Sequence, residues 1–191
     1  MKEITFVIGG CRSGKSNHAL ELAERIPGDK KIFIATCIPC DAEMEERVVQ
    51  HQRERDKSWK TIEIPIHLPQ TVLENSRTAD VILVDCLTFW MSNLLLELED
   101  NEKIIRHIEK LSKSLEDAEC SVVLVSNEVG AGIVPENELA RRFRDIVGKT
   151  NQMVATCADK VIWMVASVPS AIKDKNKNCF ENIPGSRTTM R

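Results

Sequence analysis

The chain has 191 residues, of which 42% are hydrophobic and 29% are charged, and its formal net charge is −3. This length and composition are typical of one compact globular domain and make a second full domain unexpected. The weakly acidic net charge gives no general electrostatic argument for binding nucleic acid. Nothing near the N-terminus resembles a signal peptide and no apolar run approaches the ~20 residues of a membrane span, so we expect a cytoplasmic protein.

Five apolar runs predict β-strands, and they lie at residues 4–8, 31–35, 81–84, 121–125 and 161–165. Because their apolar residues are nearly continuous rather than alternating, we expect strands buried on both faces of a mainly parallel sheet. The pattern between them predicts helices at residues 14–26, 42–57, 69–76, 88–97, 101–118 and 136–158. We expect Pro135 and Glu136 to open the last helix, since proline suits a first turn and a carboxylate complements a helix N-terminus. The fold class that follows is α/β.

The first strand leads directly into a glycine-rich segment with the spacing GxxxxGKS, made of Gly9, Gly10, Cys11, Arg12, Ser13, Gly14, Lys15 and Ser16. A phosphate-binding loop needs a strand before it and a helix after it, because the N–H groups of the turn and of the helix N-terminus together form an anion cradle. Lys15 can reach the β- and γ-phosphates, and the Ser16 hydroxyl can ligate Mg²⁺. The segment therefore predicts a nucleoside triphosphate site.

Two later strands end in polar residues. Asp85 follows four apolar residues, which is the form of a Walker B strand whose carboxylate reaches the metal shell. Residues 126–130 follow another strand, at the edge of the sheet where α/β proteins place ligand groups. An ordinary strand-to-helix turn also explains this second segment.

A strongly charged segment covers residues 43–55. Within it, His51 lies among Arg47, Arg53 and Arg55, cations that favour a neutral imidazole and attract phosphate. A neutral imidazole is a competent nucleophile toward phosphorus. A solvated surface helix explains the same composition, so the residues alone leave both interpretations open.

Seven cysteines in a chain of this length indicate reduced thiols rather than disulfides. Cys37 and Cys40 have the spacing of a redox or metal pair, but the sequence offers no second pair or histidines at matching spacing for a zinc site. We therefore expect a loop that carries two thiols. We also expect a single domain at residues 1–173, followed by a polar, poorly packed tail at 174–191.

From about Ile4 to Lys173, the motifs taken together resemble the bifunctional adenosylcobinamide kinase/adenosylcobinamide-phosphate guanylyltransferase family of cobalamin biosynthesis. The segments that follow one another in the family's order are 9–16, 34–36, 41–51, 59–63, 84–88 and 126–152. The most specific of these stretches is 127–137, which goes far beyond what a generic P-loop protein would share. The resemblance implies a P-loop NTPase-like fold of the recombinase type, with helices on both faces of a mainly parallel sheet.

Two reactions are implied by this resemblance. A nucleoside triphosphate, ATP or GTP, phosphorylates the aminopropanol hydroxyl of adenosylcobinamide, and GTP then donates GMP to that phosphate, giving adenosylcobinamide-GDP and pyrophosphate. The second reaction passes through a guanylylated histidine in the family, which corresponds to His51 here; Lys15 is the second implied catalytic residue. Ser16 and Asp85 would hold Mg²⁺. The positions implied to contact GTP are residues 9–16 with Ala35, Thr36, Cys37, Gln52, Arg53, Glu54, Arg55, Glu63 and Asp85.

Members of this family assemble as trimers, so the resemblance implies a homotrimer whose partners are a corrinoid and GTP, with no nucleic acid. Three alternatives stay open: another P-loop small-molecule kinase without a covalent step, a nucleotide-dependent regulatory ATPase, and a guanylyltransferase that has lost its kinase activity. The residues also leave open whether ATP or GTP feeds the kinase step and whether Asp85 is a metal ligand or a base.

Overall fold

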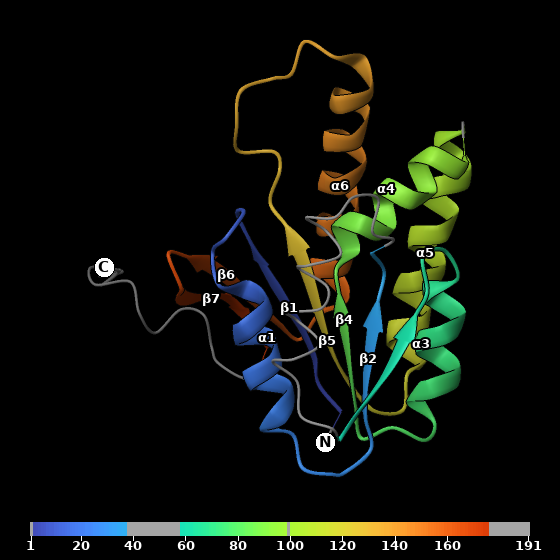
Figure 1. Cartoon of the computed structure of the whole chain (residues 1–191), viewed down its shortest axis with the longest axis vertical. Coiled ribbons are helices and arrows are strands. Elements are labelled where there is room, and N and C mark those ends of the chain that lie inside the picture. The colour runs from blue at the N-terminus through green and yellow to red at the C-terminus, as the bar shows by residue number, and fades with distance from the viewer. Residues whose placement is uncertain (1, 38–57, 99, 176–191) are drawn as a thin grey trace, which may run out of the picture.

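The computed structural model describes residues 2–37, 58–98 and 100–175. Within these residues, seven strands form one sheet in the spatial order β3-β2-β4-β5-β1-β6-β7 (Figure 1). Neighbouring strands from β3 to β6 pair in parallel, whereas β7 is antiparallel to β6. The bounds are β1 Ile4–Gly9, β2 Lys31–Ala35, β3 Trp59–Glu63, β4 Val81–Asp85, β5 Ser121–Asn127, β6 Lys160–Val165 and β7 Val168–Asp174.

The described helices cover the two faces of the sheet unequally. α1 packs on one face, and α3, α4, α5 and α6 pack on the other (Figure 1). Their bounds are α1 Lys15–Glu24, α3 Leu68–Ser76, α4 Leu87–Glu97, α5 Asn101–Asp117 and α6 Glu138–Cys157. The sheet is therefore a middle layer with helices on both sides, as the sequence predicts.

The central strand β1 shows why the predicted strands read as continuous apolar runs. All six of its residues are buried, and their side chains alternate between two cores. Val7 packs in the core that contains Ala19 of α1, whereas Phe6 and Ile8 pack in the core that contains α4 and α6. Burying one large apolar side chain contributes ~1.5–3 kcal/mol, so both faces must be apolar along such a strand. The predicted mainly parallel α/β fold is confirmed.

The sequence pattern does not predict β3 or β7, the two strands at the edges of the sheet. In β3 only Trp59 is buried, and five of the seven residues of β7 are exposed. Edge strands are solvated along one side and tolerate polar residues, so they lack the continuous apolar signal. Ala166 and Ser167 join β6 to β7 with φ of 49° and 65°, the left-handed conformation that a tight hairpin turn requires.

The prediction for the start of the last helix is wrong by two residues. α6 begins at Glu138, and Asn137 caps it, with its Oδ1 accepting a hydrogen bond from the N–H of Ala140 at 2.9 Å. Pro135 and Glu136 precede the helix, and their carbonyls accept hydrogen bonds from the Arg141 guanidinium. An asparagine cap satisfies a free N–H group, which proline in a first turn does not do.

Some predicted segments lie outside the described residues. They are the predicted helix at 42–57 and residues 176–191 of the predicted tail. At the start of that tail, Asp174 closes β7 and the Lys175 N–H donates to the Asp159 carbonyl at 2.9 Å. None of the described helices is both long enough and apolar enough to cross a membrane.

Candidate nucleotide-binding site

The glycine-rich loop between β1 and α1 has the geometry of a phosphate cradle. Gly14 adopts φ of +85°, and a Cβ atom there would lie 2.7 Å from Ser167 Oγ. A Cβ atom on Gly9 would lie 2.5 Å from the carbonyl oxygen of Met164. These two glycines are therefore required by close packing against β6 and its turn, whereas a Cβ on Gly10 would meet nothing within 4 Å.

The hairpin turn after β6 supports this loop directly. The Ser167 N–H donates to the Ser13 carbonyl at 3.0 Å, which fixes the middle of the loop. Ser13 itself is only 7% exposed, and its Oγ has no hydrogen-bond partner within the described part of the chain. Buried hydroxyls normally have a hydrogen-bond partner, so the unpaired Ser13 hydroxyl is a candidate group for binding a ligand.

Lys15 lies at the start of α1 and folds back across the loop. Its Nζ donates to the Gly10 carbonyl at 2.9 Å, so the ammonium group stays over the cradle. The first turn of α1 contains no acidic residue, and no side chain caps it. The positive end of the helix and the lysine charge are therefore both available to an anion.

Asp85 stands at the carboxyl end of β4, at the same edge of the sheet as the loop. The strand β5 lies between β4 and β1, so Asp85 and Gly9 are two strands apart. The Asp85 carboxylate makes no hydrogen bond or ion pair with the other described residues. The same holds for the Ser16 hydroxyl. Free oxygens of these two types fit Mg²⁺, which is usually held by one or two protein groups together with phosphates and water.

Metal sites built from protein side chains alone are not found in the described residues, which contain no group of three or more His, Cys, Asp or Glu placed to hold an ion. The binding of Mg²⁺ by Ser16 and Asp85 together with a triphosphate stays a prediction.

Thr36 ties the end of β2 to the residue after β4. Its Oγ1 donates to the Cys86 carbonyl at 2.6 Å and accepts from the Cys86 N–H at 3.1 Å. The Thr36 carbonyl accepts from Asn93 Nδ2 at 2.8 Å. Burial, together with the neighbouring Asp85 carboxylate, raises the pKa of the Cys86 thiol to about 12, so this thiol stays protonated. Thr36 and Cys86 thus shape the floor beside Asp85, and the nucleotide contact predicted at Thr36 stays a prediction.

The structure brings the described members of the predicted site to one edge of the sheet. Ala35 pairs in register with Asp85 on one side and with Glu63 on the other. Glu63 ends β3 and is exposed, four strand spacings from β1, which corresponds to roughly 19 Å at ~4.8 Å per spacing. The site is therefore long enough to spread a nucleotide between the loop and Glu63. His51 and residues 52–55 lie outside the described residues.

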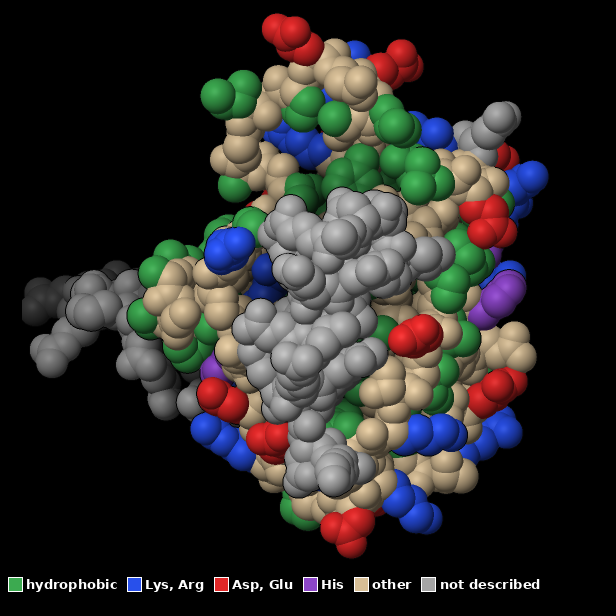
Figure 2. Space-filling model, viewed as in Figure 1, with side chains coloured by type: hydrophobic (Ala, Val, Ile, Leu, Met, Phe, Trp, Pro, Cys, Tyr) green, Lys and Arg blue, Asp and Glu red, His purple; other side chains and the backbone are tan. Residues whose placement is uncertain are grey.

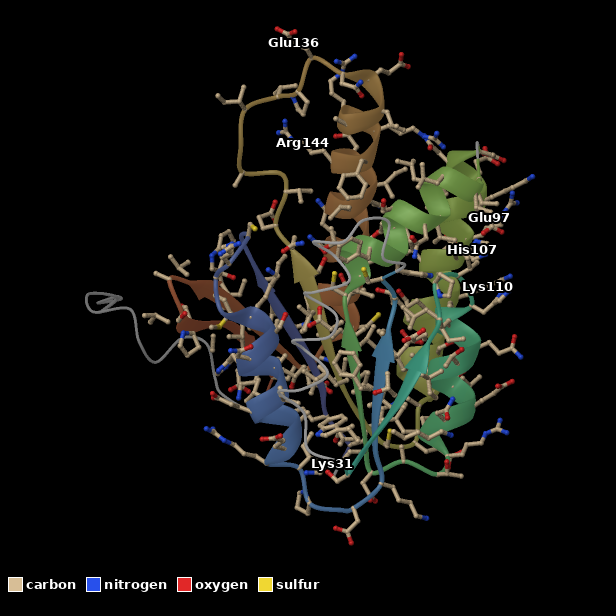
Figure 3. The ribbon with its side chains drawn as sticks, in the orientation of Figure 1. Lys31, Glu97, His107, Lys110, Glu136 and Arg144 are labelled. Atoms are coloured by element: carbon tan, nitrogen blue, oxygen red, sulfur yellow. The ribbon has the colours of Figure 1, made fainter. Side chains whose placement is uncertain are left out.

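A loop at residues 128–137 rises from the same edge of the sheet, between β5 and α6 (Figure 1). Its side chains Ile133 and Val134 are 96% and 61% exposed, and Leu139 in the first turn of α6 is 50% exposed. Figure 2 shows hydrophobic side chains on this loop and basic side chains in the hollow beside it. Arg144 extends from α6 toward the loop (Figure 3). An exposed apolar group of this kind is typical of an interaction surface.

Residues 126–130 stand out in the sequence as a polar strand end, but no role for any one of them follows from the sequence. Asn127 ends β5 and pairs in register with Gly9, the first glycine of the phosphate loop. Its position between the loop and Asp85 depends on the order of the strands, which the sequence does not reveal. The polar residues at the end of this strand are the signal in the sequence that points to Asn127.

The fold and this edge define the class of protein. It is a P-loop protein with a mainly parallel α/β sheet, in which one strand lies between the phosphate-loop strand and the strand that ends in Asp85. A family model described as cobinamide kinase / cobinamide phosphate guanyltransferase matches residues 5–172. The chain therefore belongs to this enzyme family, and the family membership predicted from the motifs is confirmed.

Two curated relatives show the extent of the similarity. The bifunctional adenosylcobalamin biosynthesis protein CobU from Salmonella typhimurium is 41% identical over 173 residues, which cover 84% of this chain and 94% of the relative. The bifunctional adenosylcobalamin biosynthesis protein CobP from Pseudomonas aeruginosa is 37% identical over 170 residues, which cover 87% and 95% of the two chains. The similarity thus extends over nearly the full length of both relatives.

Solved structures are similar only at a distant level. The flagellar accessory protein FlaH from Methanocaldococcus jannaschii has a TM-score of 0.49 and 12% identity, covering 90% of this chain and 78% of its own. The KaiC-like protein PH0186 from Pyrococcus horikoshii has a TM-score of 0.48 and 14% identity, covering 84% and 70%. Similarity at this level carries no functional information.

Proposed function

We propose that this protein phosphorylates adenosylcobinamide with a nucleoside triphosphate and then transfers GMP from GTP to the resulting phosphate, giving adenosylcobinamide-GDP and pyrophosphate. The observation that supports this proposal is one edge of the sheet that carries a phosphate cradle, Lys15 and the free Asp85 carboxylate. It occurs in a chain of the cobinamide kinase / cobinamide phosphate guanyltransferase family.

In the kinase step, the hydroxyl oxygen of the corrinoid side chain attacks the γ-phosphorus, and the bond from that phosphorus to the β-phosphate oxygen breaks. Lys15 exchanges its hydrogen bond with the Gly10 carbonyl for phosphate oxygens, because charge-assisted hydrogen bonds are the stronger ones. The hydroxyl proton passes to a base or to water. Asp85 is either that base or a metal ligand, and both roles fit its free carboxylate.

In the guanylyl transfer, the imidazole nitrogen of His51 attacks the α-phosphorus of GTP, and the bond to pyrophosphate breaks. The phosphate oxygen of the corrinoid then attacks the same phosphorus, and the bond to the imidazole breaks, which regenerates the enzyme. The loop and Lys15 spread the charge of the departing pyrophosphate. The role of His51 rests on the family motif, because this residue lies outside the described part of the structure.

Ser16 and Asp85 are the residues that would hold Mg²⁺, which when bound neutralises phosphate charge. At the other end of the site, the exposed Glu63 carboxylate is suited to accept hydrogen bonds from the N–H groups of guanine. This contact would favour GTP over ATP in the second step. Gly9, Gly10 and the rest of the loop would cradle the phosphates through main-chain N–H groups.

A homotrimer is the assembly that we propose, with the exposed apolar residues Ile133, Val134 and Leu139 as part of the contact surface. Sedimentation velocity should show that the double variant Ile133→Asp, Val134→Asp dissociates. The matched change Ile172→Asp, at an exposed apolar residue on β7, should leave the assembly intact. A wild-type monomer would contradict the trimer. The cytoplasmic location stays a prediction.

The decisive experiment incubates the protein with adenosylcobinamide, Mg²⁺ and either ATP or GTP, and separates the phosphorylated and the GDP-linked products. We expect the phosphorylated corrinoid first and the GDP-linked corrinoid only with GTP. Nucleotide binding without turnover of the corrinoid would favour the regulatory ATPase instead.

A second experiment tests the covalent step. GTP labelled at the α-phosphate should leave its label on the denatured wild-type protein, and the variant His51→Ala should carry none. His67→Ala is the matched control, since His67 lies before α3 and should not affect labelling. A kinase without a covalent step predicts phosphorylated corrinoid and an unlabelled wild-type protein.

A further inference from the structure

Asn127 occupies the middle of the proposed site. It is the last residue of β5, the strand that separates the phosphate-loop strand β1 from the strand β4 that ends in Asp85. Asn127 pairs in register with Gly9, and the N–H of the next residue, Glu128, donates to the Gly9 carbonyl at 3.0 Å. A group that reaches from Lys15 and Ser16 toward Asp85 therefore passes over Asn127.

The side chain of Asn127 lies on the α1 face of the sheet. Side chains alternate along a strand, and Val123 and Val125 pack in the core that contains α1. Asn127 follows in the same series, and a Cβ on Gly9, its neighbour in register, would point to Ser13 Oγ at 2.7 Å. The amide of Asn127 and the hydroxyl of Ser13 are thus both beside Gly9, on the face where the phosphate loop turns.

The main chain of Asn127 is held in place by buried side chains. Its N–H donates to Thr88 Oγ1 at 2.7 Å, and its carbonyl accepts from Asn151 Nδ2 at 3.1 Å. Thr88 and Asn151 are 8% and 6% exposed, and Thr88 Oγ1 also lies 3.3 Å from Ser126 Oγ. These contacts come from α4 and α6 on the opposite face, so they orient Asn127 without occupying its side chain.

The side-chain oxygen of Asn127 is buried and has no hydrogen-bond partner within the described ranges, and the same is true of Ser13 Oγ. Native proteins rarely leave buried polar atoms unpaired, and the exceptions call for a functional explanation. Two such atoms beside the first loop glycine, on the same face of the sheet, indicate that a polar ligand completes the hydrogen bonding of both. An amide also carries two N–H donors, and rotation about χ2 exchanges them with the oxygen.

We propose that Asn127 binds the terminal phosphate of the nucleoside triphosphate and so distinguishes a triphosphate from a diphosphate. This inference rests on the proposed function, because it takes the loop to be the site of the transferred phosphates. Lys15 and Ser16 follow β1 on one side of the site, Asp85 ends β4 on the other side, and Asn127 ends the strand between them. Its N–H group donates to a γ-phosphate oxygen, and Ser13 supports the same group from the loop.

The test measures the dissociation constants of a non-hydrolysable triphosphate analogue and of the corresponding diphosphate by calorimetry. The variants are Asn127→Leu, which keeps the volume and removes the polar atoms, and Asn127→Ala in case leucine prevents folding. Ser112→Ala is the matched control, because Ser112 Oγ is also buried without a partner in the described residues but lies on α5, away from the loop.

We expect the wild type and Ser112→Ala to prefer the triphosphate. Both Asn127 variants should lose roughly tenfold to a hundredfold of that preference, which is the usual effect of a hydrogen bond to a charged group. Their diphosphate affinity and their thermal midpoint should not fall, since no internal hydrogen bond of the side chain is lost. An unchanged preference in the variants, or an equal loss for both nucleotides, would overturn the role of Asn127 alone. A wild type that binds neither nucleotide would overturn the proposed function as well.

Discussion

The two ends of the parallel strands differ in whether some of their polar side chains have internal hydrogen-bond partners. At the amino end, side chains bond to the main chain: Asp159 Oδ2 accepts from the Ile4 N–H at 2.9 Å, and Asp80 Oδ2 accepts from the Lys30 N–H at 2.9 Å. At the carboxyl end, the buried side-chain oxygens of Ser13 and Asn127 have no such partner within the described residues.

This difference separates residues that hold the fold from residues that await a ligand. A polar group with an internal partner contributes to stability, and its removal leaves the partner unsatisfied. A polar group without one contributes little to folding. Substitutions of the unpaired polar groups at the carboxyl end should therefore reduce activity, and substitutions of the paired groups at the amino end should reduce stability.

The largest effect is expected for Lys15→Ala. Removing the charge that neutralises the transferred phosphates should lower kcat about 100-fold to 1,000-fold in both reactions. The free energy of unfolding should change by no more than ~0.5 kcal/mol, because among the described residues the Lys15 ammonium bonds to the Gly10 carbonyl alone. The control is Lys31→Ala, which removes a lysine at the amino end of the strands (Figure 3). The Nζ of Lys31 lies 6.0 Å from the centre of the Trp59 ring. Full activity of Lys15→Ala would contradict the site.

The same chemical change at the two ends gives the second prediction. Asp85→Asn should lower kinase activity about 100-fold while leaving the urea midpoint nearly unchanged. Asp159→Asn should leave activity unchanged and lower the free energy of unfolding by about 1 kcal/mol, because the acceptor of the Ile4 N–H loses its charge. If both variants lost stability alone, the division between the two ends would be wrong.

Two glycines in loops at the carboxyl end of the strands differ in the room that is available for a Cβ atom. Gly14→Ala should destabilise the protein by about 1–3 kcal/mol, because its φ of +85° and the Ser167 side chain leave no room for a Cβ. Gly132→Ala, in the loop at residues 128–137, should change stability by less than ~0.5 kcal/mol, since nothing lies within 4 Å. Urea unfolding of both variants measures the difference.

The smallest effect concerns pH. Burial tends to raise the pKa of Asp159, but the Ile4 N–H and the Lys175 and Lys173 ammonium groups outweigh it and lower the pKa below the ordinary 3.8. The stabilisation is therefore fully present above pH 3.8 and is lost as the pH falls through the lower pKa of the folded state. Urea midpoints of the wild type and Asp159→Asn should differ at pH 6 and converge as the solution becomes more acidic. A constant difference would exclude the ionised carboxylate as the cause.

The parts of the molecule that could be predicted share a physical cause. β1 and β4 are buried on both faces, so their residues are apolar without interruption, and the loop at residues 9–16 has a spacing set by phosphate chemistry. The sequence pattern does not predict β3 and β7, because strands at the edge of a sheet keep polar, exposed side chains. The position of Asn127 could not be foreseen, because it depends on β5 lying between β1 and β4.

The contact between Ser13 and Ser167 joins the two ends of the described chain. Gly14 packs against the same serine, and β1 needs β5 and β6 as its neighbours in the sheet. The phosphate loop is therefore encoded at the start of the chain but completed near its end. During synthesis on the ribosome, the hydrogen bond from the Ser167 N–H to the Ser13 carbonyl can form only after the turn that follows β6 has left the exit tunnel.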